Sequence, residues 1–177
     1  MKNNKVICNP DFYDNVGFNT IRSWLVEHCL CSLNEEYFQE LEPFSNKIEI
    51  EESQAFIDEL LASFQRNYPV PLDNFPNITD IFPILEIGGS QLNSNHFQEL
   101  YQILNCSSCI KRSLKKNDFP IWHINSRNLL NSTATQSAIE KVFDDAFQIK
   151  NDASVKLKRL HRDILTMEDK IKAVMVK

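Results

Sequence analysis

The strongest constraint on the fold of this chain is a regular apolar spacing between residue 154 and its last residue. Apolar side chains recur there at alternating intervals of three and four residues, at Leu157, Leu160, Ile164, Met167, Ile171 and Val174. This spacing places them in one stripe along a helix, at the a and d positions of a coiled-coil heptad. We call these six residues the apolar seam. A seam of this kind requires a partner. We expect its first turns, at Leu157 and Leu160, to pack on the domain, and the seam beyond about Met167 to project and to await an antiparallel partner helix.

The two ends of this predicted helix differ. Ser154 precedes it and is a suitable N-cap residue, whereas no Gly, Asn or Pro stop signal follows before Lys177. The helix is therefore expected to be truncated at Lys177, and the chain to be a fragment of a longer protein.

Composition favours helices and excludes one class of nucleotide site. With 42% hydrophobic and 24% charged residues, the 177-residue chain resembles ordinary globular proteins and is long enough for one domain. Its three glycines, Gly17, Gly88 and Gly89, form neither of the glycine-rich phosphate-binding patterns, so a site built on such a loop is excluded from these residues. Few glycines and long periodic runs predict an all-α fold.

Periodicity and breaker residues predict an irregular helical domain over residues 1–153 and a protruding helix over 154–177. Trp24 and Trp122 are predicted to be core anchors, and 144–153 is predicted to be a hairpin-like turn. No helix is predicted in 1–17 or 116–135. The predicted helices within the domain span residues 19–30, 35–41, 48–66, 79–85, 94–115 and 135–143. Asn93 or Ser94 is expected to cap the 94–115 helix, and Thr135 the last one. The apolar stripe of the 48–66 helix is predicted to consist of Ile50, Ala55, Phe56, Leu60, Leu61 and Phe64.

Charge is distributed unevenly along the chain. Residues 154–177 carry seven Lys and Arg against three acids, a local charge of +4, whereas the net charge of the whole chain is −5. Four of these cations fall within two helical turns, at Lys156, Lys158, Arg159 and Arg162. Clustered cations are typical of phosphate contacts, although a solvated charged face is the commoner explanation. Both interpretations remain open from the sequence.

No catalytic residues, metal ligands or cofactor sites are expected in this chain. Cys106 and Cys109 form a C-x-x-C pattern in mid-helix, where both thiols share one face, and structural packing is the favoured interpretation. A zinc site combining them with His28, Cys29 and Cys31 is the weaker alternative, because these residues are predicted to lie on helices rather than turns. The histidines have no catalytic partner at a telling spacing. An odd number of cysteines, without a signal peptide or membrane span, predicts a cytoplasmic protein.

Three segments in order resemble one protein family. They are GFNTIRSWLVEHCLCSLNEEYFQEL at 17–41, FPNITDIFPILEIGGSQLNSNHFQELYQILNCSSCIKRSL at 75–114, and IEKVFDDAFQIKNDASVKLKRLHRDI at 139–164. Together they resemble the second, endonuclease-type branch of bacterial MutS-like ATPases, whose members carry a C-terminal Smr domain. Three positions depart from the pattern. Phe147 and Asn34 stand where the family often has Gly, and Lys156 stands where an acid is common. Phe adopts a left-handed backbone poorly, so the 144–151 turn is expected to differ in detail.

The resemblance implies that the chain is an N-terminal portion of a helical core, followed by the start of a lever helix that leads to a clamp. It implies an ATPase elsewhere in the protein, with ATP and Mg, that dimerises and is possibly an endonuclease. The implied partners are branched or double-stranded DNA, ribosomes, or both, and the implied roles are recombination control, DNA repair or ribosome quality control. No membrane role is implied, and no family catalytic or ATP-binding residue maps onto this chain.

The leading hypothesis is therefore a mechanical one, in which this segment couples a clamp to an ATPase and performs no chemistry itself. The alternative is a self-contained helical interaction module that homodimerises through its coiled-coil tail. A third and weaker hypothesis is a metal- or thiol-dependent enzyme that uses the cysteine cluster.

Overall fold

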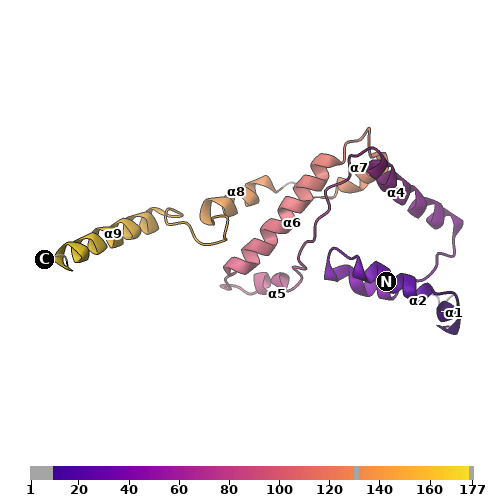
Figure 1. The fold of residues 1–177 in the computed structure, drawn as a ribbon, viewed down its shortest axis with the longest axis horizontal. Coiled ribbons are helices and arrows are strands. Elements are labelled where there is room, and N and C mark those ends of the chain that lie inside the picture. The colour runs from indigo at the N-terminus through magenta and orange to yellow at the C-terminus, as the bar shows by residue number, and fades with distance from the viewer. Residues whose placement is uncertain (1–9, 130–131, 176–177) are drawn as a thin grey trace.

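The structure, a computed structural model, describes residues 10–129 and 132–175, and this part of the chain contains helices and no strands (Figure 1). The predicted all-α fold is confirmed. The outer limits predicted for the two domains, Met1 and Lys177, lie outside the described residues. The helices are α1 (Pro10–Asn15), α2 (Phe18–Glu27), the 3-10 turn η1 (Ser32–Asn34), α3 (Glu35–Gln39), α4 (Lys47–Gln65), α5 (Ile81–Glu86), α6 (Ser94–Ser113), α7 (Pro120–Ser126), α8 (Thr133–Val142) and α9 (Val155–Met175).

Two of these helices, α1 and α7, lie where no helix was predicted. The break between α1 and α2 is made by Gly17, whose φ of 72° is readily adopted only by glycine. Helix α8 begins before Thr135, the predicted cap residue. The predicted cap of the long helix α6 is confirmed, because Asn93 accepts the backbone N–H of His96 at 2.9 Å while His96 Nδ1 faces the Asn93 N–H.

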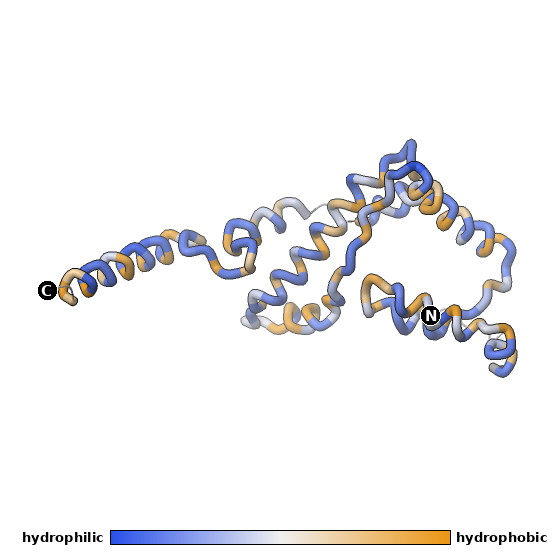
Figure 2. The backbone as a smooth tube through the Cα atoms, viewed as in Figure 1, coloured by the Kyte–Doolittle hydropathy of each residue, from blue (hydrophilic) through white to orange (hydrophobic). Residues whose placement is uncertain are grey.

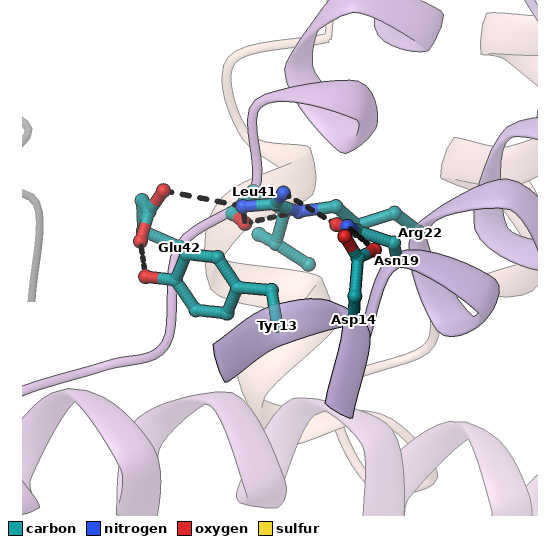
Figure 3. Close-up of polar contacts among 6 residues, drawn as sticks. All are labelled: Tyr13, Asp14, Asn19, Arg22, Leu41 and Glu42. Carbon is teal, nitrogen blue, oxygen red and sulfur yellow. Dashed lines mark hydrogen bonds and ion pairs between the residues drawn. The ribbon is translucent and has the colours of Figure 1, made fainter. Parts of the chain in front are cut away.

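Arg22 ties the N-terminal helices together (Figure 3). Its guanidinium donates from Nε and Nη2 to the Leu41 carbonyl at 2.8 and 2.5 Å and pairs with Glu42 at 3.1 Å. It also lies over the rings of Tyr13 and Phe18, at 4.9 and 5.0 Å from their centroids, and Glu42 accepts the Tyr13 hydroxyl. The planar Arg22 guanidinium, with its several donors, thus holds α1, α2 and the segment after α3 together as one unit. Trp24 is not part of this unit's interior.

The main core lies where α4, α6 and α7 meet. Val70, Leu114 and Phe119 are buried there, and Leu60, Ile110 and Trp122 pack around them. Trp122 donates from its indole Nε1 to the Phe56 carbonyl at 3.0 Å. The prediction that Trp122 is a core anchor is confirmed, whereas the same prediction for Trp24 is wrong, because 59% of Trp24 is exposed.

The N-terminus of α7 is completed by a side chain from a distant part of the sequence. Glu59 of α4 accepts the backbone N–H groups of Ile121 and Trp122 at 3.1 and 2.8 Å. This face of α4 also buries Ser63, whereas Leu61 and Phe64, predicted to belong to its apolar stripe, are exposed. Satisfying the first N–H groups of α7 therefore determines which side of α4 faces the core.

The chain forms an extended scaffold rather than a compact globule. Its accessible surface is 14149 Å², against about 8,900 Å² expected for a compact monomer of this mass. Helix α9 projects from one end, opposite the end where α4 and α7 meet (Figure 1). Hydrophobic and hydrophilic positions alternate along α9 without a covering element (Figure 2). None of the described helices has the length and apolarity needed to cross a bilayer.

Candidate partner-helix and nucleic-acid interface

Helix α9 carries both sets of residues that the sequence singled out. It begins at Val155, where the Ser154 hydroxyl accepts the backbone N–H of Leu157 at 3.1 Å. The prediction that Ser154 is the N-cap is therefore confirmed. The cap fixes the start of the helix and hence the direction in which the apolar seam faces.

The apolar seam is exposed along its whole length. Its residues have exposed fractions of 41% at Leu157, 47% at Leu160, 53% at Ile164, 65% at Met167, 59% at Ile171 and 75% at Val174. Leu157 and Leu160 were predicted to pack on the domain, and this prediction is wrong. None of the other described helices packs along α9, because the turn before Ser154 directs the helix away from the domain (Figure 1).

The predicted phosphate-contact residues lie on α9 away from the seam. With about 100° between successive residues, Lys158, Arg159 and Arg162 fall on the opposite side of the helix, and Lys156 falls at the seam's edge. All four residues are exposed. Arg159 pairs with Asp163 at 3.8 Å, one turn further on. An ion pair this exposed contributes little to stability. The four positive charges are therefore accessible to an anionic ligand.

The base of α9 is a tight turn closed by a backbone bridge between Phe143 and Ile149. The Asp144 carboxylate accepts the N–H groups of Ala146 and Gln148 at 3.0 and 2.8 Å. The predicted hairpin-like turn is confirmed. Phe147 adopts a left-handed backbone with φ of 53°, a conformation that residues other than glycine adopt poorly. Asn34, the other departure from a family Gly, has a right-handed φ of −96°.

Aromatic packing holds Phe147 in this conformation. Its ring stacks on Phe143 and meets Tyr101 edge-on, with both centroid distances 5.7 Å. The Tyr101 hydroxyl donates to Glu140 of α8 at 2.8 Å, and Lys150 donates to the Glu140 carbonyl at 2.6 Å. The hydrogen bond to Glu140 raises the pKa of Tyr101, with smaller contributions from desolvation and from the charges of Glu140 and Asp145. These contacts fix the turn to α6 and α8.

An open apolar groove of about 710 Å³ runs beside this turn. It lies between the N-terminal end of α6, helix α8 and the turn itself, and its lining includes Phe97, Ile139, Phe143, Phe147 and Ile149. The sequence analysis did not identify it, because its walls come from three separate segments.

The cysteines and histidines do not assemble into a reactive site in the described part of the chain. Cys106 and Cys109 lie within α6 and are partly buried, and burial raises the pKa of the Cys106 thiol, which disfavours the reactive thiolate. Cys29 and Cys31 lie in the loop after α2 rather than on helices as predicted. Among the described residues, no group of three or more His, Cys, Asp or Glu side chains is arranged to hold a metal ion.

The histidines make local polar contacts. His28 and His123 face the backbone carbonyls of Trp24 and Leu114 at 2.8 and 2.7 Å. His161 lies 3.4 Å from the Asn151 amide, at the base of α9. Together with the capping role of His96, these contacts account for each histidine structurally.

Two curated proteins are similar to most of this chain in sequence. No family model matches the chain. Over 160 residues, 88% of the chain, it is 25% identical to a protein described as "Endonuclease MutS2" from Geobacillus sp. (strain WCH70) and 22% identical to the "Putative endonuclease MutS2" of Bacillus subtilis (strain 168). The chain is MutS2-like. The resemblance inferred from its three sequence segments is confirmed. The chain spans only 20% of the length of these two relatives.

Proposed function

We propose that this MutS2-like chain is a core-and-lever segment that transmits movement between a nucleic-acid-embracing clamp and an ATPase elsewhere in the same protein. The observation that carries the proposal is the 21-residue helix α9, whose base is fixed by the Asp144 turn and whose apolar seam is uncovered from Leu157 to Val174. At about 1.5 Å per residue such a helix reaches about 30 Å. A rigid base and a long arm suit a part that converts a small rotation into a large displacement.

The large exposed apolar surface supports the same proposal. Exposed side chains include Trp24 on α2, Phe64 on α4 and Leu85 on α5, in addition to the seam. Surfaces of this kind are covered by other protein segments in a stable native state. In the proposed protein, a partner helix antiparallel to α9 covers the seam, and the rest of the core covers the other helices.

The chemistry of the proposed protein resides outside this chain. Gly89, with φ of 84°, serves the turn after α5 and is followed by Ser90 rather than by a phosphate-binding loop and helix. The residues present therefore do not fit ATP with Mg. We expect this chain alone to hydrolyse neither ATP nor nucleic acid, and the longer protein to be an ATPase, possibly also an endonuclease, that acts as a homodimer in the cytoplasm.

The proposed partners are branched or double-stranded DNA and ribosomes, contacted in part by the basic side of α9. The test uses the longer protein with Arg159→Ala and Arg162→Ala together. We expect weaker binding to branched DNA or ribosomes and a shallower salt dependence, by up to about one log–log unit per lost phosphate contact. Unchanged affinity and salt dependence for both partners would assign these residues to solvation.

A second experiment tests the lever itself. Ile164→Asp places a charge in the seam, and Ala173→Asp places the same charge on the other side of α9 as a matched control. We expect Ile164→Asp alone to uncouple nucleotide binding from nucleic-acid binding. Equal behaviour of the two variants would contradict the lever proposal. A stable dimer of this chain in sedimentation, abolished only by Ile164→Asp, would instead support the homodimerising interaction module.

A further inference from the structure

A second positively charged surface lies at the end of the molecule opposite α9. Residues 111–128 contain five Lys and Arg and one acid, a local charge of +4 in a chain whose net charge is −5. These residues form the last turn of α6, the following loop and α7. The five cations, Lys111, Arg112, Lys115, Lys116 and Arg127, are all exposed, and we call them the α6–α7 basic surface.

The structure brings these cations together from both ends of α7. Lys111 donates to the Leu129 carbonyl at 2.6 Å, which holds the segment after Arg127 against α6. Phe119, fully buried, and its neighbours fix the loop that carries Lys115 and Lys116. At about 1.5 Å per residue, α7 is about 10 Å long, and it separates Arg127 at its end from the loop before it that carries Lys115 and Lys116. That distance is comparable to the spacing of a few phosphates along a nucleic-acid strand.

Most of this charge is not used within the described part of the chain. The one acid of the segment, Asp118, is paired with Arg66 of α4 at 4.0 Å and does not pair with the lysines. No ion pair is formed there by Lys115, Lys116 or Arg127. Lys111 and Arg112 lie in the last turn of α6, where their positive charges interact favourably with the negative end of the helix dipole. Lys115 and Lys116 lie beyond that turn, and Arg127 follows the end of α7.

We propose that the α6–α7 basic surface contacts the phosphate backbone of a nucleic acid. The chemistry is that of the phosphodiester and not of the bases, because the surface consists of lysine and arginine side chains, and the neighbouring Trp122 is committed to the core. This inference extends the proposed function by assigning a contact surface separate from α9. The two surfaces lie on different elements that are well separated in the structure, so their tests are independent (Figure 1).

The test measures binding of this chain to a fluorescent 20-base-pair duplex DNA and to duplex RNA of the same sequence, over a series of salt concentrations. Lys115→Gln with Lys116→Gln removes two charges from the surface. Lys47→Gln with Lys141→Gln removes two other exposed charges, on α4 and α8, and is the matched control. We expect only the first variant to lose at least about tenfold in affinity at low salt and to reduce the salt slope by about two. Circular dichroism and thermal unfolding establish that both variants are folded.

Each outcome decides the proposal. Selective loss with both ligands supports phosphate contact, and loss with only one identifies DNA or RNA as the source. Equal loss in both variants, an unchanged slope, or no binding by the unsubstituted chain would overturn it. Polyglutamate that competes as effectively as DNA would also overturn it, by assigning the surface to an acidic protein segment. Arg159→Ala with Arg162→Ala, measured in parallel, separates a failure of this inference from a failure of the α9 contact.

Discussion

Replacing Phe147 with Gly and with Ala tests how the base of α9 is built. Phe147 has a left-handed backbone, which costs a residue other than glycine about 1–2 kcal/mol. Its ring contacts with Phe143 and Tyr101 contribute about 0.5–1.5 kcal/mol each. Both substitutions lose the ring contacts, but only Gly relieves the backbone. Glycine has greater conformational freedom in the unfolded chain, which offsets about 0.5–1 kcal/mol of the stabilisation gained by relieving the backbone. We therefore expect both variants to have a less stable turn than the native chain. The turn should be more stable in Phe147→Gly than in Phe147→Ala, by about 1 kcal/mol.

The assay is amide hydrogen exchange at Asp144 and Lys150, whose N–H groups donate to the Gln148 and Val142 carbonyls at 2.9 and 2.8 Å. A difference of about 1 kcal/mol corresponds to roughly fivefold in protection. Gln148 is the control position, because it is exposed and lacks a positive φ. At this position we expect the opposite order, with Gln148→Ala protecting the turn amides more than Gln148→Gly by a similar factor. If Ala protects the turn as well as Gly at position 147, the left-handed conformation is not under strain and the reasoning is refuted.

Three further predictions concern the rest of the scaffold. Glu59→Ala should destabilise the α4–α7 core by about 1–3 kcal/mol, because two N–H groups of α7 lose a charged acceptor; thermal unfolding monitored by Trp122 fluorescence measures this, and an unchanged midpoint would contradict it. The raised pKa of Tyr101 means that the stability contributed by its protonated hydroxyl is complete below pH 10, the ordinary tyrosine pKa, and is lost as the pH rises above that value. In a tyrosine absorbance titration, Tyr101→Phe should remove a step above the ordinary tyrosine pKa, and removal of an ordinary step instead would refute the assignment. Because burial raises the pKa of Cys106, its reaction with a thiol reagent at pH 8 should be slower than that of a free cysteine and should accelerate with pH; a fast reaction at neutral pH would revive the thiol-enzyme hypothesis.

Local sequence signals sufficed for the long elements and failed for the short ones. Helices α6 and α9 have caps at Asn93 and Ser154 and many periodic residues, so the sequence predicts them well. Helix α7 has seven residues and begins at Pro120, and its N–H groups are satisfied by Glu59, which is far away in the sequence. No local pattern reports such a contact. The side of α4 that is buried depends on the same contact, which explains why Leu61 and Phe64 were placed wrongly.

The positions of the seam residues on α9 could be predicted from the sequence, but their surroundings could not. Spacing identifies the seam because helical geometry determines which residues share a side. It does not determine what the seam touches, so the expected packing of Leu157 and Leu160 on the domain was wrong. The turn at Phe147, not the helix, sets the direction of α9. The α6–α7 basic surface was missed because its charges are divided among the last turn of α6, the following loop and the residue after α7.

The central claim is that another part of the longer protein covers the seam of α9. The direct measurement is the labelling rate of Ile164→Cys, with Ala173→Cys on the other side of the helix as its control. Both variants are made in this chain and in the longer protein, and peptide mass spectrometry distinguishes the labelled site from the native cysteines. The account predicts similar rates at the two positions in this chain, and in the longer protein strong protection at position 164 alone. Rapid labelling of Ile164→Cys in the longer protein would show that the seam remains uncovered, and would contradict the account.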